Sequence, residues 1–113
     1  VPVPLHPKRL RKRGYNQSEW IAMGISDFTG KEIDRHLIHR CGTSETQTNK
    51  GIYKRWKNTQ NIFALGNTSD AEGKHLLLID DVVTTGATLL SCANTLSNIK
   101  NIKISLLTLA MAQ

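Results

Sequence analysis

The chain has no apolar run of about 18 residues, the length of a membrane-spanning helix, so the sequence predicts no contact with the membrane interior. Cysteine is scarce, and Cys41 and Cys92 are too far apart for a Cys-x-x-Cys pair. This spacing excludes a disulfide framework and favours reduced thiols in a cytoplasmic protein. The four histidines show no metal-ligand spacing. We therefore predict no metal site built by the protein alone.

Familiar phosphate-binding signatures are also missing. No GxxxxGK[ST] string is present, which excludes a Walker A loop, and no GxGxxG string follows a strand, which excludes a Rossmann fingerprint. No acidic residue follows Asp81, so a receiver domain of two-component signalling would lack its phospho-accepting aspartate. If the chain binds a phosphate group, it must therefore use a different motif.

Positive charge is what the chain has in excess. Fifteen lysines and arginines against nine acidic residues give a net charge of +6. That balance predicts an anionic partner: a phosphorylated small molecule, a nucleic acid or an acidic surface. At 113 residues the chain is one domain, 1–113, with one core. It starts at Val1 with the core-like string VPVPL, which favours a piece of a longer chain.

Predicted strands and helices alternate along the chain. Residues 1–5 predict either an edge strand or a strand whose prolines lie where no donor is needed, because Pro2 and Pro4 cannot donate ladder hydrogen bonds. A helix is predicted from Asn16 or Ser18 to Phe28, with Gly30 as its stop. Further strands are predicted at 36–41, 61–65, 75–79 and 102–110, and a second helix at 86–97. This order predicts a parallel α/β sheet with helices.

Apolar spacing predicts which faces these helices bury. The first helix would pack through Trp20, Ile21, Met23, Gly24 and Phe28, and the second through Leu89, Leu90, Ala93 and Leu96.

The string LLLIDDVVTTGAT at 76–88 carries the chemistry. Asp80 and Asp81 follow an apolar run, at the sheet edge where parallel strands bind ligands. Adjacent carboxylates need donors or cations, which ribose hydroxyls and a divalent metal supply. The next residues open a helix whose free N–H groups, with Gly86, can cradle a phosphate. A threonine-rich cap without a ligand would explain Thr85 but not the acidic pair.

These thirteen residues resemble the 5-phosphoribosyl-1-pyrophosphate (PRPP) motif of type I phosphoribosyltransferases. VPVPL followed by RGYNQ, at residues 13–17, resembles the start of the phosphoribosyltransferase-like domain of the ComF family, named for competence for DNA uptake. The stretch holding Gln47, Arg55, Asn58 and Phe63 resembles a later part of that domain. The resemblance spans nearly the whole chain. It implies a three-layer fold with a parallel sheet flanked by helices.

The resemblance also implies roles for residues. Asp80 and Asp81 would face the ribose hydroxyls of PRPP or another ribose 5-phosphate ligand, with Mg²⁺ bound through PRPP. The residues wrapping the 5-phosphate would be Thr84, Thr85, Gly86, Ala87 and Thr88. The turn after the first strand would bind pyrophosphate through Pro7, Lys8 and Arg9. Residues 43–60 correspond to a flexible loop that closes over the reacting centre, and its catalytic candidates are Lys54 and Arg55.

Two departures from the family pattern matter. Purine-salvage enzymes carry an acidic residue where Thr84 stands, so the chain is not expected to salvage hypoxanthine or guanine. ComF-like proteins usually begin with a cysteine-rich zinc-binding segment, which this sequence lacks. We interpret that difference as truncation upstream of Val1.

Three functions stay open from the sequence. The first is a Mg²⁺-dependent phosphoribosyltransferase in the cytoplasm, commonly a homodimer in this class, that releases pyrophosphate. The second is a module that binds PRPP without transferring it. The third is a DNA-uptake accessory domain whose basic residues 8–13 contact phosphates while Tyr15 or Trp56 stacks on a base.

Overall fold

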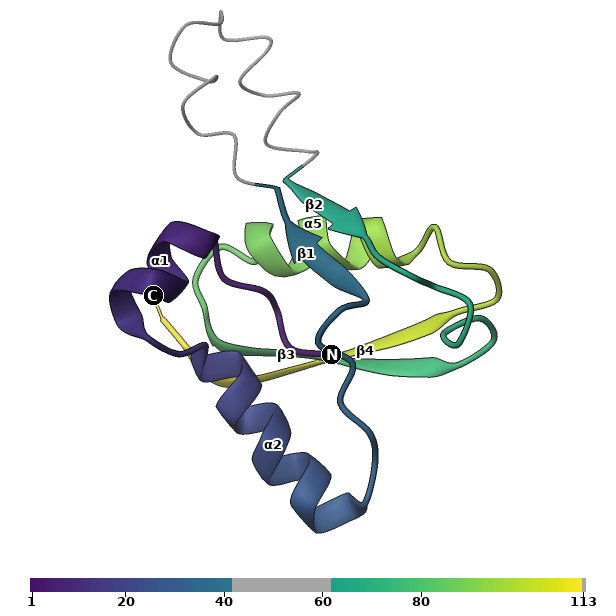
Figure 1. Ribbon diagram of the computed structural model, residues 1–113, viewed down its shortest axis with the longest axis horizontal. Coiled ribbons are helices and arrows are strands. Elements are labelled where there is room, and N and C mark those ends of the chain that lie inside the picture. The colour runs from purple at the N-terminus through teal and green to yellow at the C-terminus, as the bar shows by residue number, and fades with distance from the viewer. Residues whose placement is uncertain (42–61, 113) are drawn as a thin grey trace, which may run out of the picture.

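The computed structural model describes residues 1–41 and 62–112 (Figure 1). Their elements are, in chain order, α1 (Pro7–Arg13), α2 (Gln17–Thr29), β1 (Ile38–Arg40), β2 (Phe63–Leu65), β3 (His75–Val83), α5 (Ala87–Leu96) and β4 (Lys103–Met111). Strands β3 and β4 form a parallel pair, whereas β1 and β2 form an antiparallel pair. Within the described residues, no helix has the length and apolar character needed to cross a membrane.

Strand β3 lies in the middle of the main sheet. On one side it pairs with β4, with His75 opposite Lys103 and Val83 opposite Met111. On the other side the N-terminal segment runs parallel to it: the Val3 N–H donates to the Ile79 carbonyl (2.8 Å) and the Ile79 N–H to the Val1 carbonyl (2.9 Å). The predicted N-terminal edge segment is therefore confirmed.

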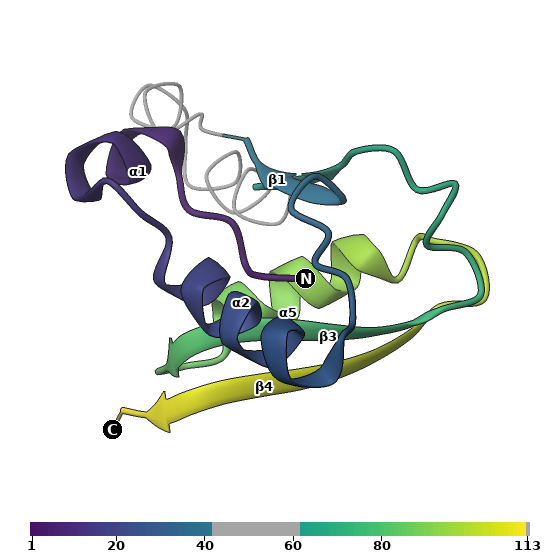
Figure 2. The ribbon, with the colours of Figure 1, turned by 60° about the horizontal axis from the view of Figure 1, so that its bottom comes forward.

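Helices cover both faces of this sheet, with α5 on one side and α2 on the other (Figures 1 and 2). The core lies mainly under α5, where Leu78, Cys92 and Leu96 are fully buried. Leu37, Ile38 and Phe63 bring the β1–β2 pair into the same cluster. The parallel sheet between helices agrees with the fold class that the sequence predicted.

The ends of α2 are as predicted, but its buried face is not. Asn16 caps the helix by accepting from the Ser18 N–H (3.0 Å), and Gly30 ends it in the left-handed conformation (φ 75°). Trp20 and Phe28 are 66% and 92% exposed, while the buried residues are Ser18 and Ala22. The small side chains of α2 take its buried positions, so its large apolar residues are left exposed to solvent.

The predicted buried face of α5 is also wrong at one position. Leu90 is exposed, and Cys92 takes the buried position between Leu89 and Leu96. Burial raises the pKa of the Cys92 thiol to about 12. The thiol therefore stays protonated at neutral pH and acts as a core residue.

Three other predictions of local structure were wrong. The strands near 36–41 and 61–65 pair with each other antiparallel, Ile38 opposite Leu65, instead of joining the parallel sheet. Parallel pairing needs a crossover, and the sequence between them predicted no helix to make one. Residues 7–13 form α1 instead of an open turn, because Pro7 at its first position is preset for a helix. Strand β3 runs on to Val83, so the acidic pair lies within it.

Candidate functional site

Asp80 is the sixth of the nine residues of β3 and lies opposite Thr108 of β4. One oxygen of its carboxylate, Oδ1, accepts from the Ser18 hydroxyl (3.0 Å) and from the Asp81 N–H (2.9 Å). Burial raises the pKa of Asp80 above its ordinary value, and these two hydrogen bonds oppose the shift, while Asp81 adds to it. The fold therefore holds a half-buried carboxylate in one orientation at some electrostatic cost.

Asp81 is held in a similar way but is more open to solvent. Its Oδ1 accepts from the N–H of Val82 (2.8 Å). Each aspartate therefore uses one oxygen to bind the backbone N–H that follows it. The structure brings the two carboxylates together as the sequence predicted, on a strand whose backbone fixes both.

The loop after β3 leads directly into α5. Gly86 is the N-cap of the helix, in the left-handed conformation (φ 83°), and no side chain caps the helix. Among the described residues, no atom would lie within 4 Å of a Cβ built at Gly86, so none of them fills the space beside it. Thr85 Oγ1 accepts from the Ala87 N–H at 3.2 Å, which shapes the turn. Thr85 therefore uses the Ala87 N–H, whereas the next N–H groups of α5, just beyond the acidic pair, have no side-chain cap among the described residues.

Ser18 is a site residue that the sequence analysis missed. It is 3% exposed, and its neighbour Asn16 both caps α2 and donates from Nδ2 to the Val3 carbonyl (3.0 Å). The N-terminal end of α2 is therefore fixed to the first strand and to Asp80 at once. A polar residue at a helix position that packs on a sheet was the signal that could have identified Ser18.

Replacing Ser18 by alanine should raise the pKa of Asp80 further, because the variant loses a donor to the charged form. The expected shift is upward, because one hydrogen bond to the charged form is lost. NMR titration of the Asp80 carboxyl carbon measures it. Replacing Ser26, a half-buried serine of α2 whose hydroxyl donates to the Lys31 carbonyl and not to Asp80, by alanine is the control and should leave that titration unchanged. An unshifted Asp80 in the Ser18 variant would show that the contact has no electrostatic role.

The other predicted site residues have different outcomes. Pro7, Lys8 and Arg9 form the first turn of α1, and Lys8 and Arg9 are exposed. Lys54 and Arg55 lie outside the described residues. Across residues 1–41 and 62–112, no group of three or more His, Cys, Asp or Glu side chains could hold a metal ion.

Comparison with known proteins identifies the class. The family described as "Phosphoribosyl transferase domain" matches residues 11–112. The chain belongs to this family, and the acidic pair followed by an uncapped helix start lies inside the matched region. No solved structure gives a significant match.

Sequence relatives narrow the class to the ComF-like type I phosphoribosyltransferase domains. The chain is 34% identical over 96 residues to the DNA utilization protein YhgH of Salmonella typhi, covering 85% of this chain and 41% of that protein. It is 31% identical over 90 residues to Competence protein F of Haemophilus influenzae (79% and 39%) and 37% identical over 89 residues to Competence protein ComFC of Bacillus subtilis (79% and 34%). The chain therefore spans about two fifths or less of the length of these relatives.

Proposed function

We propose that this domain binds PRPP with Mg²⁺ and transfers its phosphoribosyl group to an acceptor, with release of pyrophosphate. The observation that carries the proposal is the unbroken run from Asp80 to α5. It presents two fixed carboxylates and then an open, uncapped helix start. Carboxylates suit vicinal hydroxyls, and free N–H groups suit a phosphate, so the order along the chain matches ribose followed by 5-phosphate.

In this proposal the chain's own residues bind and orient the substrate. Asp80 and Asp81 would accept from the two ribose hydroxyls, and residues 84–88 would hold the 5-phosphate. The bond from C1 to the pyrophosphate oxygen then breaks with its electron pair leaving on pyrophosphate, and a lone pair of the acceptor forms the new bond to C1. Lys8, Arg9, Lys54 and Arg55 are the cations proposed to stabilise the departing charge.

The described residues fit a Mg²⁺ ion carried by the ligand. Mg²⁺ keeps several waters and is usually bound through one or two carboxylates plus substrate phosphates. Two carboxylates, at Asp80 and Asp81, are what this part of the chain offers. The ion would supply charge neutralisation for the pyrophosphate.

Calorimetric titration of the purified chain with PRPP, with and without MgCl₂, tests the proposal. Ribose 5-phosphate serves as the comparison ligand, because it lacks the pyrophosphate. We expect Mg²⁺-dependent binding that is tighter for PRPP than for ribose 5-phosphate. Absence of binding of both ligands, from a sample with a cooperative unfolding transition, would contradict the proposal.

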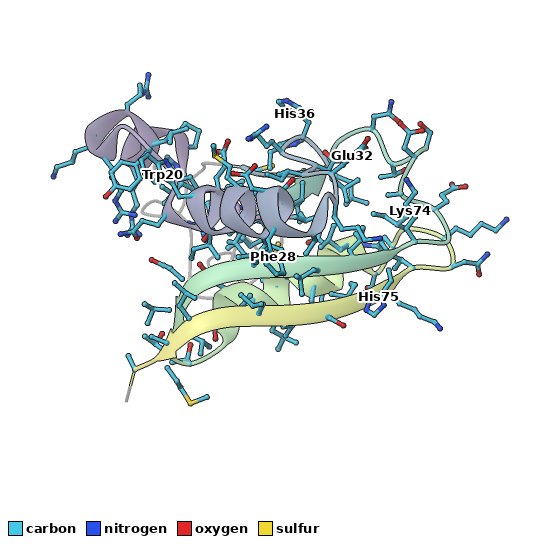
Figure 3. All side chains as sticks on the ribbon, turned by 90° about the horizontal axis from the view of Figure 1, so that it is seen from below. Trp20, Phe28, Glu32, His36, Lys74 and His75 are labelled. Carbon is cyan, nitrogen blue, oxygen red and sulfur yellow. The ribbon has the colours of Figure 1, made fainter. Side chains whose placement is uncertain are left out.

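A second candidate function has an observation of its own. Tyr15 and Trp20 pack with ring centroids 5.5 Å apart and are 42% and 66% exposed. Tyr15 follows the cations of α1 in the sequence, and Trp20 lies near that helix (Figure 3). Exposed aromatic rings beside cations are typical of surfaces that bind single-stranded nucleic acid. If α1 binds DNA, affinity for a single-stranded oligonucleotide will fall steeply with salt and on Trp20→Ala, but not on Asp80→Asn.

A further inference from the structure

Arg40, the last residue of β1, is held in an unusual environment. Its guanidinium carbon lies 5.1 Å from the centroid of the Phe63 ring, and Phe63 is its partner in the β1–β2 register. The Nε atom is buried and has no hydrogen-bond partner among the described residues. A buried guanidinium donor without an acceptor is costly and is rarely retained without a reason.

The charges around Arg40 come from the proposed site. Burial lowers the pKa of Arg40, and the positive charge of Arg9 lowers it further, whereas the negative charge of Asp80 opposes the shift. Arg40 therefore lies within electrostatic reach of two site residues, Arg9 on α1 and Asp80 on β3. In the described part of the chain, neither arginine forms an ion pair, since the carboxylate–cation contact found there joins Glu19 to Arg35.

The positive charges of Arg9 and Arg40 repel each other, and an anion between the two would relieve that repulsion. We infer that Arg40 is an anion-binding residue that, together with Arg9, contacts the diphosphate group of the ligand. This inference rests on the proposed function, because the diphosphate is that of PRPP. The backbone cradle at 84–88 can hold the 5-phosphate without a cation, so the more highly charged diphosphate is the group that needs the arginines.

The position of Arg40 supports the assignment of the 5-phosphate to residues 84–88 and of the diphosphate to the two arginines. Its two charged site neighbours are a residue of the proposed pyrophosphate segment and a residue of the proposed ribose pair. The ring of Phe63 fixes the guanidinium plane, which limits the entropy that the side chain would lose on binding. A flat, prepositioned guanidinium suits bidentate contact with phosphate oxygens.

The test compares PRPP with ribose 5-phosphate, both with MgCl₂, on the variant Arg40→Met. Methionine preserves the apolar packing on Phe63 and removes the charge. Affinity for PRPP should fall about 10-fold or more, the effect of losing a charge-assisted hydrogen bond, while affinity for ribose 5-phosphate should change less than about twofold. Arg35→Met removes the same charge at the Glu19 pair and should leave both affinities unchanged.

Other results would overturn the inference. Equal losses for the two ligands, or unchanged PRPP affinity in a folded Arg40→Met variant, would make Arg40 a structural residue. Arg40→Gln carries the same expectation and replaces the methionine variant if that variant does not fold. If the wild-type chain binds no PRPP, the proposed function fails. Titration with inorganic pyrophosphate then tests Arg40 alone: binding that is lost in Arg40→Met supports the anion site, and no binding to wild type overturns it.

Discussion

Replacing Asp80 and Asp81 together by asparagine should weaken the binding of Mg²⁺–PRPP by about 1–3 kcal/mol, because the ribose hydroxyls would lose charge-assisted acceptors. The amide oxygens can still accept from the Ser18 hydroxyl and from the backbone N–H groups of Asp81 and Val82, so the local structure should persist. Calorimetric titration of the double variant measures the loss. Unchanged affinity would remove the acidic pair from the site.

Replacing Asp80 alone by asparagine should stabilise the fold, although it removes a proposed contact to the ligand. Folding raises the pKa of this carboxyl, so ionised Asp80 destabilises the folded state. This destabilisation is absent below the ordinary aspartate pKa and complete above the raised pKa of the folded state. At pH 7 Asp80→Asn should therefore stabilise the fold by about 0.5–1 kcal/mol, a modest gain because the carboxyl is only half-buried. The gain should vanish below about pH 4. A variant that loses both affinity and stability would indicate a structural role for Asp80.

Replacing Gly66 by alanine should destabilise the fold by about 1–3 kcal/mol, the range for forcing extra atoms into a packed site. A Cβ there would lie 2.1 Å from the backbone oxygen of His36, which cannot rotate away as a side chain could. The Gly66 N–H also donates to the Leu37 carbonyl (2.7 Å), at the base of the β1–β2 pair. Urea unfolding measures the change in the free energy of unfolding.

Gly24→Ala is the matched control for that experiment. Gly24 lies within α2, and a Cβ at this position would meet no atom within 4 Å. Alanine should therefore stabilise the chain by about 0.4–1 kcal/mol, because it lowers the conformational entropy of the unfolded state. Equal effects of the two substitutions would mean that the base of the β1–β2 pair tolerates a larger residue.

The sequence predicted the features that depend on neighbouring residues. The cap at Asn16, the stop at Gly30 and the passage from the acidic pair into α5 through Gly86 all follow from local chemistry. Family membership was predictable for the same reason, because the run at 76–88 is continuous.

Features that depend on distant contacts were not predictable. The spacing of Trp20 and Phe28 indicated a buried face, but close packing of Ala22 on the sheet decided the orientation of α2. The pairing of β1 with β2 depends on a register between segments far apart in sequence. Arg40 had no signal of its own, because its position is defined by Phe63 and by charges on other elements.

The continuity of β3, α5 and β4 has a consequence for local unfolding. The proposed contacts to ribose and 5-phosphate all lie within residues 75–111, a stretch whose contacts are close in sequence. Arg40 belongs to the separate β1–β2 pair, whose ladder has three residue pairs against eight in the β3–β4 ladder, and a short ladder opens more easily than a long one. Backbone amides of β1 should therefore exchange with deuterated solvent sooner than those of β3. On warming, the chain would then lose its contacts with the diphosphate before its contacts with the ribose.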